Sequence, residues 1–320
     1  MKPVEAVIDA AGATVPRVME RVERRMAEVS VDHGAALARH AGDTIAAGGK
    51  RLRPLLVCLA AGVPPPQSDS LVHAAVAVEL VHGATLVHDD VLDSSLLRRG
   101  RPTVVASAGR RMATATGDLL FSRAFAELSL ARSLPSIRVL SRASSELALG
   151  ELMQRSDAWR GDVTLERYLE RCRLKTAVLF RAACELGAIE GEGPIDALGT
   201  FGEQVGLAFQ LLDDVLDVSG PPERTGKPQG ADLLDGTITL PLIEARDRDP
   251  ELAALQVRDL HTTADAKRVC ERIAATGALG TARARALELV ARAKSILPAL
   301  PSRQRAALDL VADGVVERYS

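Results

Sequence analysis

Aspartates occur twice in the chain in the same arrangement. The segment LVHDDVLD at 86–93 is echoed by QLLDDVLD at 210–217. Residues four apart lie on one face of a helix, so each segment presents two carboxylates together, with a third about 100° around the helix. Three carboxylates on one turn repel each other unless a cation neutralises them. The two groups are Asp89, Asp90 and Asp93, and Asp213, Asp214 and Asp217.

Oxygen ligands of this kind suit Mg²⁺, which keeps several waters and typically binds one or two carboxylates plus substrate phosphates. A single D-D-x-x-D segment is equally well explained as a solvated acidic helix face, because short motifs match by chance. Two copies, each inside an apolar helix, make that alternative much weaker. The repeat therefore predicts a Mg²⁺ site.

Basic residues gather near the acidic groups. The segment GGKRLRP at 48–54 places Lys50 and Arg53 at a glycine-rich helix start, where free N–H groups and the helix dipole also favour anions. Arg98 and Arg99 follow the first acidic group closely. Arginine binds phosphate oxygens bidentately, while lysine offers a point charge. Each basic cluster alone is better explained as solvated surface or ion pairs, but together with the aspartates they predict Mg²⁺-diphosphate binding.

Two further polar residues are aligned with the acidic groups. His82 lies two helical turns before the first group, and Gln210 lies one turn before the second, where its amide could donate to the same anion. A histidine in this position is usually structural, and only its alignment makes it a candidate. Lys175 and Thr176 in RLKTAVLF, and Lys227 in TGKPQGADL, are surface residues unless a family comparison assigns them a role.

The elements that position these residues are expected to be helices. Hydrophobic residues make up 47% of the chain and aromatic residues only 2%, so the apolar content is mainly Ala, Leu and Val, which favours helices over strands. Apolar residues recur every three or four positions, without strand-like alternation. No break between these elements is long or polar enough for an interdomain linker, so residues 1–320 are expected to form one all-α domain. The expected helices lie near 17–29, 33–47, 52–62, 68–93, 104–132, 136–157, 164–189, 195–218, 237–248, 265–276, 280–296 and 302–318.

The composition also limits partners and location. With 42 acidic and 40 basic residues, the chain has no global field that would attract nucleic acid. No apolar run approaches the roughly 20 residues that span a bilayer, so no transmembrane segment is expected. The N-terminus acquires charges too early for a signal peptide. Four dispersed cysteines without C-x-x-C spacing agree with a reduced, cytoplasmic setting.

Taken together, these segments resemble the trans-isoprenyl (polyprenyl) diphosphate synthase family, of the bacterial medium-chain, long-chain or geranylgeranyl type. The resemblance covers roughly residues 48–245. It implies the isoprenoid synthase fold, which is a single-domain bundle of about ten or more helices around a central cavity. It also implies a homodimer, and condensation of isopentenyl diphosphate with an allylic diphosphate. The matching segments are GGKRLRP at 48–54, ELVHGATLVHDDVLDSSLLRRGRPT at 79–103, GDLLFSRAF at 117–125, LKTAVLF at 174–180, FQLLDDVLD at 209–217 and GKPQGADLLDGTITLPL at 226–242.

The resemblance also implies roles for individual residues. Three Mg²⁺ ions would be ligated by Asp89, Asp93 and Asp213. Supporting or water-mediated contacts would come from Asp90, Asp214 and Asp217, and Asp217 is therefore included in the metal site. Isopentenyl diphosphate would be held by Lys50, Arg53, His82 and Arg99. The allylic diphosphate would be held by Arg98, Lys175, Thr176, Gln210 and Lys227. Catalysis would rest on Asp89, Asp90, Asp93, Arg98, Lys175, Asp213, Asp214 and Lys227. One departure is Thr237, where many relatives carry lysine.

In this family a bulky residue four or five positions before the first aspartate stops chain growth early. Here those positions hold Thr85 and Ala84, which are small. We therefore expect a product longer than farnesyl diphosphate, with Phe121 and Phe125 on the following helix, together with Leu128, as candidates for a deeper floor. Geranylgeranyl diphosphate remains an alternative product, and Ala84 is also explained by close helix packing alone.

Three rival functions remain. A class I terpene cyclase shares the first acidic motif, but normally carries an N-D-x-x-S-x-x-x-E type second site. A regulatory subunit of a heteromeric synthase usually loses one acidic motif or its basic partners, and both are intact here. A third rival is a helical scaffold whose acidic turns merely bind Ca²⁺ loosely.

Overall fold

The structure, a computed structural model, describes residues 3–31, 40, 42, 44–45, 51–98, 100–221 and 228–317. Most of the helix expected at 33–47 lies outside these residues. The same holds for three expected ligands of the diphosphates, Lys50, Arg99 and Lys227.

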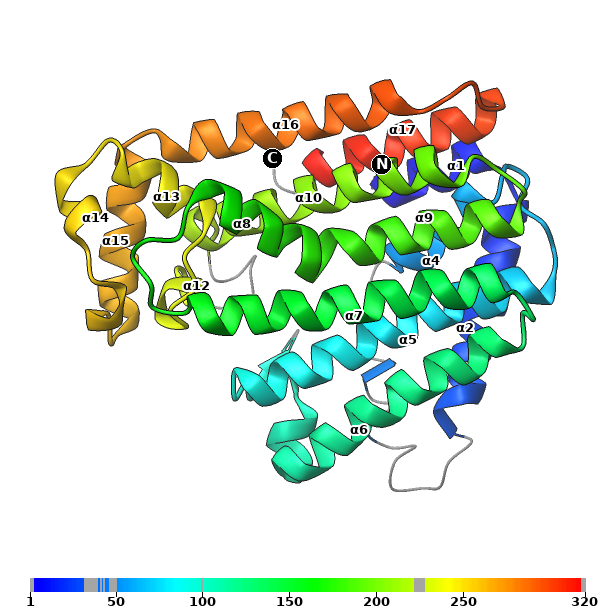
Figure 1. Cartoon of the computed structure of the whole chain (residues 1–320), viewed down its shortest axis with the longest axis horizontal. Coiled ribbons are helices and arrows are strands. Elements are labelled where there is room, and N and C mark those ends of the chain that lie inside the picture. The colour runs from blue at the N-terminus through cyan, green and yellow to red at the C-terminus, as the bar shows by residue number, and fades with distance from the viewer. Residues whose placement is uncertain are drawn as a thin grey trace. The chain divides into compact units, whose positions relative to one another are not determined.

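The protein is all-α, as the sequence predicts (Figure 1). The short elements are a π-helical turn at Arg173–Ala177, a 3₁₀ turn at Val257–Asp259, and a small antiparallel hairpin of β1 (Leu97–Arg98) and β2 (Arg101–Pro102). The helices are α1 (Pro3–Ala11), α2 (Thr14–Val31), α4 (Leu52–Ala60), α5 (Asp69–Leu92), α6 (Val104–Ser129), α7 (Leu134–Asp157), α8 (Leu165–Cys172), α9 (Val178–Glu190), α10 (Ile195–Ser219), α12 (Ala231–Leu234), α13 (Leu240–Arg246), α14 (Pro250–Ala254), α15 (Thr263–Ala275), α16 (Ala278–Ile296) and α17 (Ser302–Glu317).

Several helix boundaries follow from local hydrogen bonding. The hydroxyl groups of Ser68, Thr103 and Thr164 accept from the backbone N–H three residues later and so cap the starts of α5, α6 and α8. Thr262 forms a complete capping box with Asp265 at the start of α15. These caps satisfy donors that have no partner inside the helix.

The chain forms two compact units. Unit 1 consists of Met1–Ser144, Leu179–Gly202 and Ile296–Val311, and unit 2 consists of Ser145–Val178, Glu203–Ser295 and Ala312–Ser320. The first acidic group belongs to unit 1 and the second to unit 2. The expectation of one domain over residues 1–320 stays a prediction.

Helix α5 is the central helix of unit 1. It packs against α2, α4 and α6, and α5 and α6 run side by side (Figure 1). By length and composition it could cross a membrane, so the expectation that no apolar run is long enough was wrong. However, 67% of its apolar window is buried inside the protein, as in the core helix of a soluble domain. The apolar character of α5 is explained by this packing.

A buried ion cluster joins three helices of unit 1. The carboxylate of Glu127 on α6 is fully buried and accepts from Arg25 Nε of α2 at 2.8 Å. Its Oε1 also lies 2.6 Å from His73 Nδ1 of α5. Burial raises the pKa of Glu127, but the hydrogen bonds from Arg25 and His73 outweigh burial and lower that pKa below its usual value. The ionised carboxylate therefore ties α2, α5 and α6 together.

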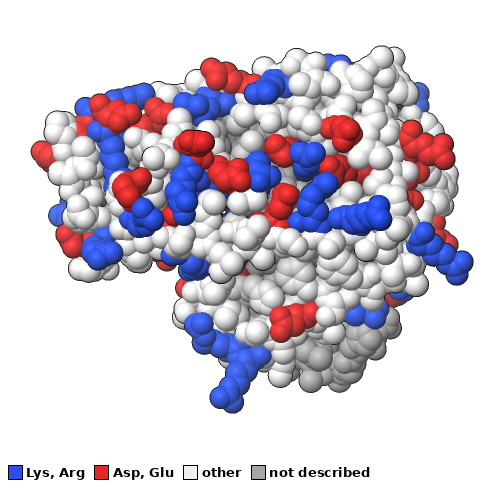
Figure 2. Space-filling view, in the orientation of Figure 1, with Lys and Arg blue, Asp and Glu red and all other residues white. Residues whose placement is uncertain are grey.

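Charged residues are mixed in sign on the face that Figure 2 shows. Lys and Arg lie among Asp and Glu, so the described residues of this face present no extended field of one sign. This distribution agrees with the near balance of charges in the sequence.

Candidate active site

The first acidic group lies at the C-terminal end of α5 in unit 1. Asp89 is half-buried, Asp90 is buried, and Asp93 is the exposed C-cap residue. The backbone N–H of Asp93 donates to Asp89 O at 2.8 Å, which closes the last turn. Helix geometry therefore leaves Asp89 and Asp93 on the accessible side and turns Asp90 inward.

Asp90 is paired with Arg98 of the short hairpin. Arg98 Nε and Nη2 lie 2.9 and 2.8 Å from Asp90 Oδ1. Burial raises the pKa of Asp90, the Arg98 guanidinium opposes that effect, and the charge on Asp93 adds to it, with a raised pKa as the result. The hairpin, which the sequence did not predict, holds Arg98 against the acidic group.

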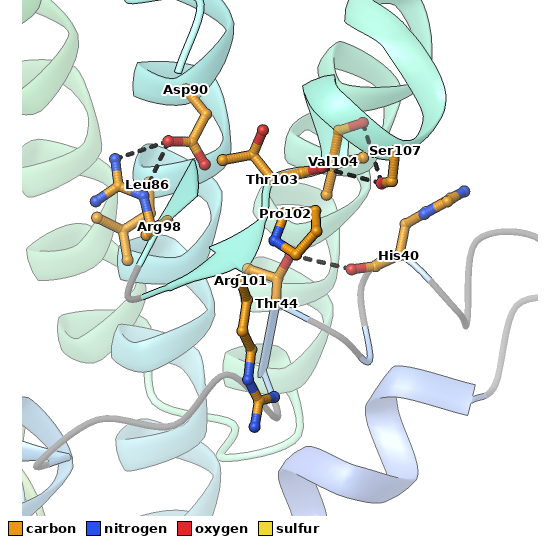
Figure 3. A pocket seen from close by; sticks show the side chains of 10 residues that line it. All are labelled: His40, Thr44, Leu86, Asp90, Arg98, Arg101, Pro102, Thr103, Val104 and Ser107. Atoms are coloured by element: carbon orange, nitrogen blue, oxygen red, sulfur yellow. Dashed lines mark hydrogen bonds and ion pairs between the residues drawn. The ribbon is translucent and has the colours of Figure 1, made fainter. Parts of the chain in front are cut away.

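A cavity of about 280 Å³ opens beside this ion pair (Figure 3). Asp90 and Arg98 line it, together with Leu86 of α5 and residues at the start of α6. Among the described residues neither Asp89 nor Asp93 contributes to its lining. The full lining is His40, Thr44, Leu86, Asp90, Arg98, Arg101, Pro102, Thr103, Val104 and Ser107.

The second acidic group lies on α10 in unit 2, within a chain of hydrogen bonds. Asp213 is half-buried, whereas Asp214 and Asp217 are buried. Asp214 Oδ1 accepts from Gln210 Nε2 at 2.7 Å, and Gln210 Oε1 accepts from Thr176 Oγ1 at 2.7 Å. The structure therefore brings two expected diphosphate ligands, Thr176 and Gln210, together with the second acidic group.

Lys175 and Thr176 lie in the π-helical turn between α8 and α9. The sequence analysis predicted one continuous helix here. Single π-helical turns inside α-helices are frequent at functional sites, and this one contains both residues that the family resemblance selected from the segment.

Glu151 on α7 is an acidic neighbour that the sequence analysis missed. Lys175 Nζ lies 2.5 Å from Glu151 Oε2, and Arg155 Nε donates to the other oxygen at 2.6 Å. Burial raises the pKa of Glu151, but Lys175 and Arg155 outweigh it and lower that pKa. Glu151 is thus an ionised partner of Lys175. The sequence alone showed only that Glu151 lies one helical turn before Arg155.

Asp232 is a second missed residue, from the segment GADLLD. Its backbone N–H donates to Asp217 Oδ2 at 3.3 Å. Burial, followed by the charge on Asp232 and with a smaller contribution from Asp213, raises the pKa of Asp214 to about 8, although hydrogen bonds from Tyr168 and Gln210 oppose this. Asp232 therefore adds a fourth carboxyl group to the second acidic group.

The residues of this group fit a divalent cation. Their donors are carboxylate oxygens, which Mg²⁺ prefers. Burial first, and then the neighbouring acidic charges, raise the pKa of Asp214, and a bound cation would favour its ionised form. Within the described part of the chain, no set of three or more His, Cys, Asp or Glu side chains forms a ready-made metal cage.

The remaining expected ligands lie on α4 and α5. The guanidinium of Arg53 lies 4.7 Å from the centroid of the Phe180 ring, within unit 1. His82 is half-buried, and its backbone carbonyl accepts from the Thr85 hydroxyl at 2.8 Å. The neighbouring Arg51 instead pairs with Glu23 and Glu79, which gives it a structural role at the start of α4.

The expected chain-length residues lie along α5 and α6 of unit 1. Ala84 is fully buried, while Thr85, Phe121 and Phe125 are half-buried. The ring of His88, one turn after Ala84, stacks on Phe121 with centroids 5.8 Å apart. The small residue and the rings thus lie on two neighbouring helices, and their effect on product length stays a prediction.

These features define the class of protein. The polyprenyl synthetase family model matches residues 35–275, so the chain belongs to that family and is a prenyltransferase. The match covers both acidic groups, the π-helical turn and Asp232.

The similarity to individual relatives extends over most of the chain. Heptaprenyl diphosphate synthase component 2 of Geobacillus stearothermophilus is 42% identical over 241 residues, 74% of each chain. Octaprenyl diphosphate synthase of Escherichia coli is 36% identical over 264 residues, 80% of this chain and 82% of its own. A polyprenyl synthase from Caulobacter crescentus, crystallised with calcium and isoprenyl diphosphate, superposes with a TM-score of 0.92 at 36% identity, covering 99% of this chain and 98% of its own. This likeness establishes the isoprenoid synthase fold.

Proposed function

We propose that the protein is a Mg²⁺-dependent trans-polyprenyl diphosphate synthase that condenses isopentenyl diphosphate head-to-tail with an allylic diphosphate. The observation that carries the proposal is the chain from Thr176 through Gln210 to Asp214, which links the π-helical turn to the second acidic group. Both acidic groups are intact, and each has a basic residue close to it in sequence or space.

The roles of the residues follow from their charges. Asp89 and Asp93 would hold Mg²⁺ at the first acidic group, and Asp213 with Asp217 would hold it at the second. When bound, Mg²⁺ neutralises the diphosphate and stabilises it as a leaving group. Arg98 and Lys175 add positive charge near each acidic group, and Thr176 and Gln210 supply hydrogen bonds.

This chemistry requires no nucleophile from the protein. Departure of pyrophosphate leaves an allylic cation, which the double bond of isopentenyl diphosphate attacks. The condensed product then loses a proton, and we assign the departing pyrophosphate as the base that accepts this proton. Thr237 stands where many relatives carry lysine, so this site has one cationic side chain fewer. Binding of the departing pyrophosphate therefore depends more heavily on the remaining cationic side chains.

We infer a product longer than farnesyl diphosphate. Ala84 is small and buried, and Thr85 beside it is small as well, so neither of these two positions before the first aspartate carries a bulky side chain. The relatives named for heptaprenyl and octaprenyl products favour the same length class, with geranylgeranyl diphosphate as the alternative.

The subunit composition has two candidate answers. The family resemblance favours a homodimer, and Leu149 and Leu152 on α7 are 56% and 66% exposed, as at a surface that a second chain covers. The relative named component 2 favours instead a catalytic component that needs a second, different chain. A cytoplasmic location and the lack of a nucleic-acid partner stay as the sequence predicted them.

The pure protein tests these alternatives. It is incubated with Mg²⁺, isopentenyl diphosphate and farnesyl diphosphate, and the products are sized by chromatography. Elongated diphosphates support the proposal, whereas cyclised hydrocarbon would indicate a terpene cyclase and no product a regulatory or dependent component. Light scattering on the same sample gives the subunit number, and activity of a homodimer alone would exclude the two-component alternative.

A further inference from the structure

Tyr168 is a buried hydroxyl donor to the second acidic group. It lies on α8 in unit 2, has no exposed surface, and its hydroxyl donates to Asp214 Oδ2 at 2.6 Å. The guanidinium carbon of Arg171 lies 5.6 Å from the centre of its ring. Burial, together with the charge on Asp214, raises the pKa of the Tyr168 phenol far above its usual value, so the hydroxyl keeps its proton.

The carboxylate of Asp214 sets the orientation of Gln210. Its two oxygens accept from two donors, Tyr168 on Oδ2 and Gln210 Nε2 on Oδ1. The amide nitrogen of Gln210 faces the carboxyl group of Asp214, so the amide oxygen faces away from it. That oxygen accepts from Thr176, which obliges the threonine hydroxyl to donate in this direction.

A defined set of groups then remains for a substrate. The Gln210 nitrogen carries a second N–H, and the Thr176 oxygen keeps lone pairs. With the opposite amide orientation, the Gln210 oxygen would face the Asp214 carboxylate, and the donor and acceptor pattern would be reversed. The carboxylate that prevents this reversal is itself held by Tyr168.

We propose that Tyr168 is a positioning residue for the reaction, which fixes Asp214 and through it the amide of Gln210 and the hydroxyl of Thr176. The inference rests on the proposed function. Asp214 then acts through Gln210 rather than on the substrate, which differs from the catalytic role that the family resemblance implies for it.

Tyr168→Phe tests the proposal, because it removes the hydroxyl and keeps the buried ring. Loss of a short, buried hydrogen bond that positions Asp214 predicts a fall in kcat/KM of about tenfold or more. Thr116→Val is the matched control. It removes another fully buried hydroxyl, which bonds only to Met112 O of its own helix at 2.8 Å. We expect it to lower stability without lowering kcat/KM.

A double-mutant cycle with Gln210→Ala separates positioning from structure. If Tyr168 acts through Gln210, the double variant is no slower than Gln210→Ala alone, because the amide to be oriented is gone. Rate losses that multiply in the double variant would overturn the proposal, as would Tyr168→Phe kinetics equal to those of Thr116→Val.

If Tyr168→Phe does not fold, Asp214→Asn replaces it in the cycle, because an amide at this position no longer dictates the orientation of Gln210. A double variant no slower than Gln210→Ala alone would then support the proposal, and rate losses that multiply would overturn it. An unaltered protein that neither elongates an allylic diphosphate nor binds a non-reactive allylic thiodiphosphate with Mg²⁺ would refute the proposed function itself. An active protein with multiplying effects would refute only this inference.

Discussion

Gly150→Ala probes how closely α7 supports the π-helical turn. A Cβ added at Gly150 would lie 2.7 Å from the backbone nitrogen of Lys175 and 2.9 Å from the Cβ of Leu174. Carbon atoms in contact are normally about 3.5–4.0 Å apart. The turn that carries Lys175 and Thr176, or the helix beneath it, must therefore move by about 0.5–1 Å.

The consequences for stability and for activity should differ in size. Overpacking costs about 1–3 kcal/mol, and the better helix propensity of alanine offsets about 1 kcal/mol of that, so the free energy of unfolding should fall by about 0–2 kcal/mol. A positioning group displaced by about 1 Å can cost about 100-fold in rate. We therefore expect kcat/KM to fall by about 10- to 100-fold in a protein that remains folded.

The assay combines thermal unfolding with steady-state elongation of an allylic diphosphate. Gly280→Ala on α16 is the control, because no heavy atom lies within 4 Å of the position of its added Cβ. It should raise the free energy of unfolding by about 0.4–1 kcal/mol and leave the rate unchanged. If Gly150→Ala matched Gly280→Ala in both measurements, the contact between α7 and the turn would not support the site.

Two other predictions concern the core and the product. Glu127→Gln should lower the free energy of unfolding by about 1–3 kcal/mol at neutral pH, because Arg25 and His73 lose a buried ionised partner. Because the pKa of Glu127 is lowered from 4.5, its contribution is present above about pH 4.5 and lost as the pH falls below that value. The variant should therefore lose less stability on acidification, and an unchanged acid profile in chemical denaturation would contradict this. Ala84→Phe should shorten the product in chromatographic sizing, and an unchanged length would mean that the growing chain does not pass this residue.

The sequence predicted the long elements of the fold well. Helices α5, α6, α7 and α10 have enough turns for apolar periodicity to show, and Ser68 and Thr103 mark two of their starts. Helices α12 and α14 have four and five residues, which is too short for a period. The β1–β2 hairpin has two residues in each strand, so its pairing left no alternating pattern.

The sequence predicted those site residues that are charged and belong to a recognisable motif. It missed the residues whose place in the site depends on tertiary contacts. The aspartate groups were visible because the spacing repeats, and Thr176 and Gln210 came from the family resemblance. Nothing in the local sequence shows that Glu151 meets Lys175, or that the Tyr168 hydroxyl reaches Asp214. Both contacts join helices that are far apart in the chain, and the π-helical turn likewise depends on packing rather than on local composition.

The central claim is that each acidic group takes part in the Mg²⁺-dependent binding of a diphosphate. Calorimetric titration of a non-reactive allylic thiodiphosphate, with and without Mg²⁺, tests it most directly in the unaltered protein and in the variants Asp89→Asn and Asp213→Asn. The account predicts Mg²⁺-dependent binding that either single substitution abolishes, with folding retained by circular dichroism. Undiminished Mg²⁺-dependent binding in either variant would contradict it.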